Sequence, residues 1–273
     1  MRIESRFRLL SASVAGFALV SLAGCPTRPQ GPEPYSAAKV GAVAAATGSQ
    51  PGSGSQARQR HEGRPFDVAS RESLLTILAF RGGTLAKVGH NHVIASHDVS
   101  GTFYVPDDVS HSTFELHIPV GQLSIDEPDL RAQEGPDFPK DVPDSAKEGT
   151  RRNMLSEALL NGAQYTDITL VSQHIAVLPD PTRQPGTSAR EAQSASQIRA
   201  DVQVTIRGQA QAISVPVTYS LANGVLTASG ELPLKQTDLG LTPFTAMLGA
   251  LAVQDEMRVK FHFVAHASAT TGN

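Results

Sequence analysis

The sequence predicts an all-β domain of antiparallel strands, arranged as a closed barrel or as a sandwich. Residues 112–120 and 198–206 alternate apolar and polar side chains, which is typical of strands with one buried face. Asn223-Gly224 stands between two further alternating stretches, and this pair tolerates the positive φ angles of a tight hairpin. Strands do not alternate regularly with helices, so antiparallel pairing is expected. The pattern is compatible with both architectures.

The N-terminal 24 residues have the organisation of a secretory signal peptide. Three arginines precede an apolar run at 9–22, which is shorter than a comfortable membrane span. The run ends at 22–25 in Leu-Ala-Gly-Cys, which resembles the bacterial lipobox. Cys25 is the only cysteine, so its position favours lipidation over disulfide formation. We expect residues 1–24 to be removed and Cys25 to anchor an exported, periplasm-facing lipoprotein in the cell envelope.

Composition divides the remaining chain into a tether and a folded domain. Residues 25–65 are rich in Pro, Gly, Ser, Ala and Gln, and such a segment buries too little apolar surface to fold. We expect a disordered tether there, one β-domain at 66–268 and a flexible tail at 269–273. The formal net charge of -3 and the lack of a long basic run argue against nucleic acid as a partner.

The strands of the domain are predicted in sequence order from alternation and turn chemistry. Residues 99–105 and 112–120 are expected to form a hairpin, because the link between them contains Pro, two Asp and Ser. After 198–206, strands are expected at 213–221 and 226–232. Pro216 is expected at an edge or a bulge, because it has no N–H for a ladder. The last strand is expected to present Met257, Val259, Phe261, Phe263 and Ala265 on one face.

Three segments interrupt the strands. Ser145–Leu160 has apolar residues at helical spacing, with Asp144 as its expected N-cap. Phe244–Val253 is expected to form a short helix or lid after Pro243. Pro179–Ser196 is expected to be an exposed, mobile loop.

The inward faces of the strands carry large apolar side chains whose role depends on the width of the fold. In a sandwich they form an ordinary core, whereas a lipocalin-sized barrel leaves room for one ligand. The chain has no Trp and 5% aromatic residues, which favours open space inside. The residues expected to line such a pocket are Phe103, Phe114, Leu116, Val204, Ile206, Val215, Phe261 and Phe263.

Three blocks of sequence, in their order along the chain, resemble the YceI-like family of bacterial secreted proteins. The first comprises 120–126, 149–155 and 165–170. The second is 202–217, a strand-Gly-strand pattern, and the third is 236–241. The resemblance implies an extended, lipocalin-like barrel of about eight strands with one or two short helices. It also implies binding of a polyisoprenoid or comparable long-chain lipid, with no catalytic residues to carry over.

The chain departs from that family pattern in a histidine-rich segment, which contains His90, His92 and His97. On an extended segment His90 and His92 project to the same side, where two imidazoles can bind a metal, with His97 as a third ligand after a turn. Two other interpretations remain open. The histidines are exposed or capping residues, or they bind a ligand head group or gate the entrance of the barrel.

Two neighbouring arginines are candidates for binding a ligand, whereas the serines close to histidines are not candidates for catalysis. Arg151 and Arg152 are candidates for binding a phosphate or carboxylate head group, or they are ordinary helix-surface residues. Asp238 is interpreted as a structural helix cap. No nucleophile is nominated, because no Gly-x-Ser-x-Gly elbow is present and Ser96 and Ser172 lie in expected strands or turns.

The leading hypothesis is an envelope lipoprotein, not an enzyme, that binds, sequesters or carries an isoprenoid-type or other long-chain lipid. Its expected partners are that apolar lipid and the membrane reached through Cys25, and no cofactor is expected beyond the bound lipid. One alternative is a histidine-dependent metalloprotein or redox accessory factor on the same barrel. Another is a structural envelope lipoprotein that docks an unspecified protein partner.

Overall fold

The computed structural model describes residues 61–179 and 195–268. All of them belong to one structural unit, Ala57–Asn273. The predicted signal peptide, Cys25, the tail and most of the tether and of the Pro179–Ser196 loop lie outside the described residues. Among the residues described, none of the helices combines the length and the apolar character needed to traverse a bilayer.

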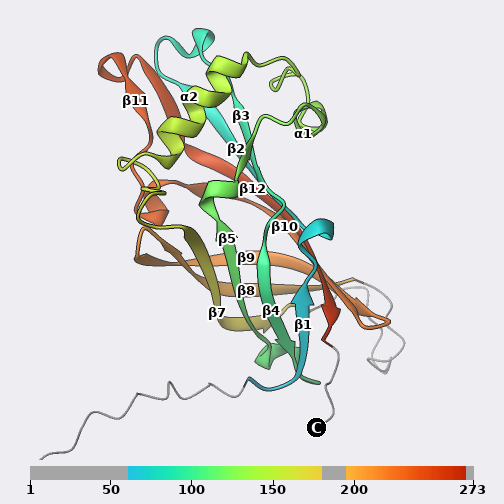
Figure 1. Cartoon of the computed structure of the whole chain (residues 1–273). Helices are drawn as coiled ribbons and strands as arrows, with labels where there is room; N and C mark the ends of the chain where they lie inside the picture. The colour runs from blue at the N-terminus through green and yellow to red at the C-terminus, as the bar shows by residue number, and fades with distance from the viewer. Residues whose placement is uncertain (1–60, 180–194, 269–273) are drawn as a thin grey trace, which may run out of the picture. The chain divides into compact units, whose positions relative to one another are not determined.

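Eight antiparallel strands form a closed ring (Figure 1), so the predicted barrel is confirmed and the sandwich is excluded. The ring closes because the first strand pairs with the last, with Phe66 opposite Ala267. The first strand begins at Arg64, two residues before the expected boundary. In ring order the strands are β1 (Arg64–Val68), β4 (Ser100–Val105), β5 (Thr113–Pro119), β7 (Asp167–Val177), β8 (Ser196–Ile206), β9 (Gln209–Ala222), β10 (Val225–Lys235) and β12 (Leu251–Ala267).

An extension of the sheet continues beyond one end of the ring. β12 pairs with β1 at residues 265–267 and with β2 between residues 252 and 262. The 3-10 helix η1 (Ser70–Glu72) separates β1 from β2, so the two strands follow one another along β12. The further strands are β2 (Leu74–Gly82), β3 (His92–Ser96) and β6 (Ser124–Ile125), and the helices α1 (Pro128–Gln133) and α2 (Asp144–Leu155) lie at the same end (Figure 1).

Tight turns with left-handed backbone join the strands where the sequence predicted them. Asn223 and Gly224 have φ of 52° and 78° and connect β9 to β10. Arg207 and Gly208, with φ of 53° and 71°, connect β8 to β9. Positive φ at both positions gives a hairpin turn whose twist matches that of the flanking strands.

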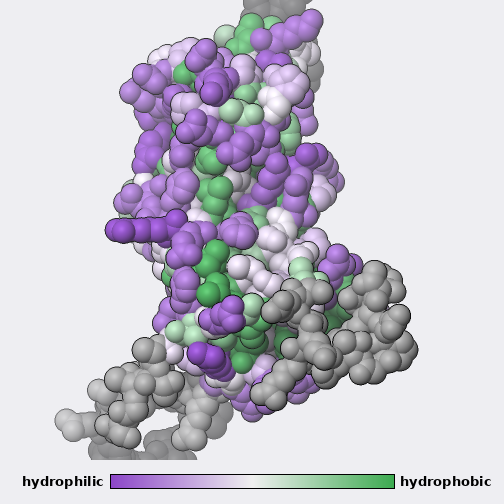
Figure 2. All heavy atoms as spheres, turned by 90° about the vertical axis from the view of Figure 1, so that its right-hand side faces the viewer, coloured by the Kyte–Doolittle hydropathy of each residue, from purple (hydrophilic) through white to green (hydrophobic). Residues whose placement is uncertain are grey.

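The core lies inside the ring, because each strand turns its apolar face inward. On β8 all five apolar residues of the predicted alternation, Ile198, Ala200, Val202, Val204 and Ile206, are buried. The exterior seen in Figure 2 is mainly hydrophilic, with small apolar patches. Pro216 pairs with Arg199 on β8 but lies outside the paired stretch of β9 and β10, as expected for an edge position.

The predicted helix at Ser145–Leu160 exists but is shorter. α2 begins at Asp144 and ends at Leu155, followed by Ser156 with extended backbone. Asp144 does not cap the helix, because it is the first helical residue and Pro143 occupies the N-cap position. Proline fixes φ near the value needed at a helix start, so it delimits the helix here without a side-chain hydrogen bond.

The predicted helix at Phe244–Val253 is wrong, because this segment is a hairpin. β11 (Thr245–Ala246) pairs with the start of β12, and the 3-10 helix η6 (Met247–Gly249) forms the turn. Met247, Leu248 and Gly249 have positive φ of 51°, 57° and 85°, and three such residues in succession cannot continue a right-handed helix.

Candidate functional site

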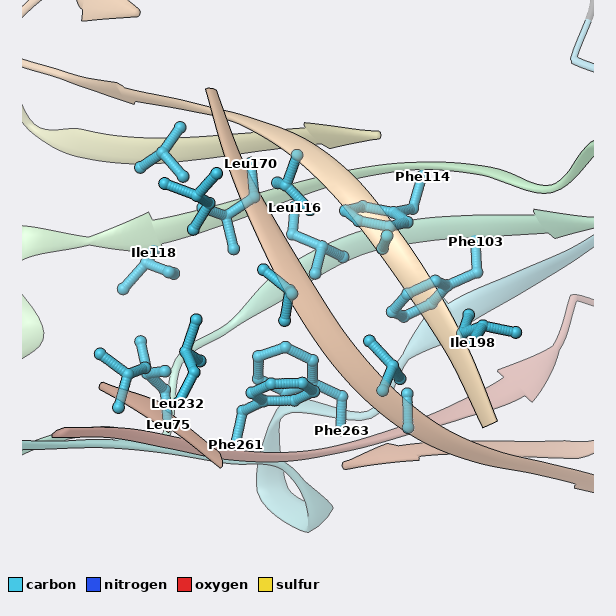
Figure 3. A pocket seen from close by; sticks show the side chains of 18 of the residues that line it. Leu75, Phe103, Phe114, Leu116, Ile118, Leu170, Ile198, Leu232, Phe261 and Phe263 are labelled. Atoms are coloured by element: carbon cyan, nitrogen blue, oxygen red, sulfur yellow. The ribbon is translucent and has the colours of Figure 1, made fainter. Parts of the chain in front are cut away.

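The main candidate site is a cavity inside the ring. It has a volume of about 190 Å³ and is bounded by inward-facing side chains from β2, β4, β5, β7, β8, β9, β10 and β12. Figure 3 shows Phe103, Phe114 and Ile198 toward one end of this view and Leu75, Ile118 and Leu232 toward the other. The strand alternation produces this wall, because every second side chain of each strand projects into the ring.

All of the residues expected from the sequence to line a pocket do line this cavity. They are Phe103, Phe114, Leu116, Val204, Ile206, Val215, Phe261 and Phe263. Two aromatic pairs stand among them. The rings of Phe103 and Phe114 have centroids 5.4 Å apart, and those of Phe261 and Phe263 are stacked at 5.2 Å. Such pairs present flat apolar surfaces to whatever occupies the cavity.

The wall carries very few polar groups. Of the lining residues only Ser112, Thr113 and Tyr219 have polar side chains. Thr113 Oγ1 lies 3.0 Å from His61 Nδ1, whereas Ser112 Oγ is buried and has no hydrogen-bond partner among the described residues. Ser112 follows the 3-10 helix η3 (Val109–His111), so the end of the cavity near η3 offers one free hydroxyl.

The pairing between β9 and β10 covers only part of both strands. The two strands pair only from the Asn223-Gly224 turn to the Thr218–Ser229 pair. A Cβ on Gly230 would lie 2.4 Å from Pro216 O, so glycine is needed where the strands make their last close approach. Beyond that point the 3-10 helix η5 (Thr237–Leu239) contacts both strands, and its buried Leu239 lines the cavity.

A carboxylate on β12 holds η5 in place. Asp255 accepts hydrogen bonds from Thr237 Oγ1 at 2.7 Å and from Thr237 N–H at 2.9 Å. These hydrogen bonds lower the pKa of Asp255 below its ordinary value. Asp238, which the sequence suggested as a cap, lies inside η5, and Gln236 occupies the N-cap position of η5.

His92 belongs to a polar network in the extension and does not line the cavity. Its Nδ1 lies 2.6 Å from Asp126 Oδ2, and its Nε2 lies 3.1 Å from Thr150 Oγ1 on α2. Asp126 Oδ1 accepts from Val93 N–H at 2.9 Å and from Arg131 Nη1 at 2.5 Å. The network therefore joins β3 to both helices.

Arg131 is the most deeply buried charged residue of this network. Its side chain is fully buried, donates to Pro139 O and Asn91 O at 2.7 Å each, and lies over the ring of Phe138. Burial by itself would raise the pKa of Asp126, but hydrogen bonds from His92 and Val93 N–H and the charges of His92 and Arg131 hold that pKa below its ordinary value. The Asp126–Arg131 pair is thus a buried ion pair, in which Arg131 Nη2 has no hydrogen-bond partner among the described residues.

The sequence gives no signal for this network, although His92 itself is one of the candidate residues that the sequence identifies. Asp126 and Arg131 are ordinary acidic and basic residues in the sequence, and 34 positions separate Asp126 from His92. The arrangement of Asp126, His92 and Thr150 has the order of a hydrolase triad. However, Thr150 Oγ1 also donates to Ala146 O within α2, so a hydroxyl with one proton cannot serve both contacts as donor.

The other head-group candidates and the expected metal ligands lie apart from the cavity. Arg151 donates to Leu123 O at 2.7 Å and to Gly121 O at 2.5 Å, and so fastens α2 to the link between β5 and β6. Arg152 is exposed, 3.9 Å from Glu148. His97 Nε2 lies 3.0 Å from Glu127 Oε1, so the three predicted imidazoles do not converge. Within residues 61–179 and 195–268, no group of three or more His, Cys, Asp or Glu side chains is placed to hold a metal.

His90 lies beside His92, with ring centroids 6.2 Å apart. It borders a second, smaller cavity of about 150 Å³ together with Arg81, Arg131 and Asp137. This cavity is in the extension and contains charged groups, in contrast to the apolar cavity inside the ring.

Comparison with known proteins gives one family match. Residues 72–265 match the model of the YceI-like domain. No curated protein matches the sequence. Among solved structures, Burkholderia cenocepacia BcnA is 17% identical, with a TM-score of 0.48 over 72% of this chain and 99% of that chain.

Two further solved structures are similar at lower identity. A polyisoprenoid binding domain from Saccharophagus degradans, implicated in plant cell wall breakdown, is 13% identical, with a TM-score of 0.45 over 74% of this chain and 98% of its own. The Campylobacter jejuni YCEI protein is 11% identical, with a TM-score of 0.42 over 63% of this chain and 82% of its own.

Proposed function

The chain belongs to the YceI-like domain family, and from that premise we propose that it binds an isoprenoid-type or other long-chain lipid inside the barrel. The observation that carries the proposal is the cavity wall, whose lining side chains are apolar apart from Ser112, Thr113 and Tyr219. Transfer of an apolar chain from water to such a wall is favourable by about 0.8 kcal/mol for each CH₂. The protein acts by holding the lipid, as a carrier or a store, and not by catalysis.

The size of the cavity suggests a slender ligand and some widening on binding. Its volume of about 190 Å³ is below the roughly 300–1,000 Å³ of pockets for drug-sized ligands. The wall consists mainly of aliphatic and aromatic side chains, so rotamer changes can widen it without breaking hydrogen bonds across the ring. A linear prenyl or acyl chain fits this requirement better than a rigid ring system.

The free hydroxyl of Ser112 suggests how the lipid is oriented. Its Oγ is buried without a partner among the described residues, and an unsatisfied buried hydroxyl costs roughly 1–3 kcal/mol. A hydroxyl, carbonyl or similar polar head at the η3 end of the cavity would satisfy it. The apolar chain would then extend toward Leu239 and Met257.

The proposed setting is the cell envelope, with Cys25 acylated and the barrel facing the periplasm. The support is the lipobox-like sequence at residues 22–25 and the lack of any other cysteine. The metalloprotein alternative is disfavoured, because His92 and His97 are hydrogen-bonded to Asp126 and Glu127. A purely structural lipoprotein that docks a protein remains an outcome of the test.

The test is native mass spectrometry and lipid extraction of the full chain purified from its own membrane. We expect a long-chain lipid at close to one molecule per barrel. Ala200→Phe fills the cavity from β8, and Arg199→Phe adds the same ring to the outer face of the same strand. Lipid should be lost from the first variant and retained by the second, with cooperative thermal unfolding in both. Protein that is folded and consistently free of lipid would overturn the proposal.

A further inference from the structure

Five exposed apolar side chains gather on two loops at the end of the extension. Val88 and Met247 are each 71% exposed and Leu248 is fully exposed, while Leu85 and Phe244 are exposed to 41% and 37%. We call these five residues the apolar tip. In Figure 1 the β11 hairpin and the loop between β2 and β3 lie at the end of the barrel opposite the start of β1.

The two loops form one structure. Leu85 N–H donates to Ala250 O at 2.8 Å. Gly83 approaches the same residue so closely that a Cβ on Gly83 would lie 2.4 Å from Ala250 O, and its φ is 83°. The tip is therefore a fixed feature of the fold and is not a set of unrelated surface residues.

The backbone conformation at Met247 and Leu248 does not suit the apolar residues found there. Met247 and Leu248 both have left-handed φ, which costs a non-glycine residue roughly 1–2 kcal/mol and is easiest for Gly, Asn and Asp. Neither side chain recovers that cost by packing, because both are highly exposed. Stability of the isolated protein therefore does not explain apolar residues at this turn.

Between them, the two chain segments that form the tip carry basic side chains and no carboxylate. The two segments are residues 73–97 and 239–254, and neither contains Asp or Glu. Arg81 and Lys87 lie in the first segment, and both are exposed. At the base of the same loop, the second cavity is bordered by Arg81, His90 and the fully buried Arg131, whose Nη2 has no hydrogen-bond partner among the described residues. Asp137 is the one carboxylate among the side chains that border it.

We propose that the apolar tip inserts into the surface of a bilayer that contains anionic lipids. Apolar side chains at the end of a protrusion and basic side chains beside them match the two layers of such a surface, the acyl boundary and the phosphates. A stable protein interface needs roughly 800 Å² and 20–30 residues on each side, which two short loops do not offer. The contact does not depend on the lipid in the barrel, although it would place the barrel where that lipid is exchanged.

The proposed anchor leaves enough chain for this contact. The 36 residues from Cys25 to Arg60 span at most about 120 Å when extended. β12, the longest strand, has 17 residues and measures no more than about 58 Å. A barrel tethered at Cys25 can therefore turn its far end toward the membrane that holds the anchor.

The chain contains no tryptophan, so a single introduced one reports the environment of the tip. The full chain with Leu248→Trp is reconstituted in vesicles of phosphatidylcholine with phosphatidylglycerol, and fluorescence is recorded with and without brominated acyl chains. We expect blue-shifted emission and strong quenching. Leu221→Trp is the matched control, because Leu221 is exposed and lies at the C-terminal end of β9, outside the tip. This variant should show neither the blue shift nor the quenching.

Charge reversal tests the basic part of the proposal. Each basic side chain near an anionic surface is worth about 1 kcal/mol, so Lys87→Glu in the Leu248→Trp background should weaken insertion of the tip, followed by quenching, by at least roughly fivefold. Arg199→Glu on β8 is the matched control and should leave it unchanged. Added salt should weaken the contact.

Three outcomes would overturn the inference. One is solvent-like emission of folded Leu248→Trp protein in anionic vesicles. Another is a shift that follows the protein-to-lipid ratio rather than the anionic lipid, which would identify a second copy of the chain. The third is a shift unaffected by Lys87→Glu. Lipid occupancy measured on the same samples by native mass spectrometry reports the proposed cavity function separately.

Discussion

The ring and the extension of this protein are held together by different kinds of interaction. Inside the ring, an almost continuous apolar wall surrounds a cavity of about 190 Å³. In the extension, Asp126, His92 and Arg131 form a buried polar network that joins β3 to α1 and α2. Apolar contacts are non-directional and tolerate movement, whereas buried charges need each partner in place. The ring can therefore adapt to a ligand while the extension stays rigid.

The largest expected effect is in the extension, from Asp126→Ala. This change leaves the guanidinium of Arg131 buried without its counter-ion. The free energy of unfolding should therefore fall by about 3–5 kcal/mol. Urea unfolding measures it. Asp144→Ala removes a carboxylate that is 92% exposed and should change stability by less than about 0.5 kcal/mol. Equal losses in the two variants would contradict a special role for the network.

Acid should act on the same network. The pKa of Asp126 in the folded protein is lower than its ordinary value of 3.8, so the folded state favours the ionised carboxylate. Its contribution to stability is fully present above pH 3.8 and is lost as the pH falls through the folded pKa. Urea midpoints measured against pH should therefore converge for the wild type and Asp126→Ala at low pH. A constant difference down to the lowest pH would show that ionisation is irrelevant.

In the ring, a smaller effect of the opposite sign is expected from Ser112→Ala. Removing a buried hydroxyl without a partner should leave the lipid-free protein unchanged or more stable by up to about 1 kcal/mol. The same variant should bind lipids with a polar head less tightly, which lipid competition followed by native mass spectrometry would detect. Ser214→Ala, at an exposed position of β9, should alter neither property. A destabilised Ser112→Ala protein would mean that the hydroxyl has a partner within the fold.

The smallest expected effect is at the apolar tip. Met247→Asn combined with Leu248→Asn places residues that tolerate left-handed backbone at the turn, and should raise stability by about 1 kcal/mol or less. Thermal unfolding measures the change. Val88→Asn removes an equally exposed apolar side chain from the neighbouring loop and should leave the melting temperature unchanged. A loss of stability in the double variant would indicate that the two side chains pack within the fold.

Alternation along strands explains how much of the cavity was predictable. Val204 and Ile206 face inward because side chains on a strand project with a period of two, so their common face was visible in the sequence. Helical spacing was less reliable. In Phe244–Val253 the apolar residues at Met247 and Leu248 are exposed at a turn, and their spacing reflects no buried face.

The sequence by itself determined the antiparallel strands, the inward apolar faces and the positions of the tight turns, because each depends on residues close together in the chain. Only the tertiary structure decided that the ring closes through β1 and β12, and that Asp126 and Arg131 meet His92 in the extension. Those contacts join residues that are far apart in the sequence. Local alternation and spacing carry no information about which distant partner a strand or a charge will find.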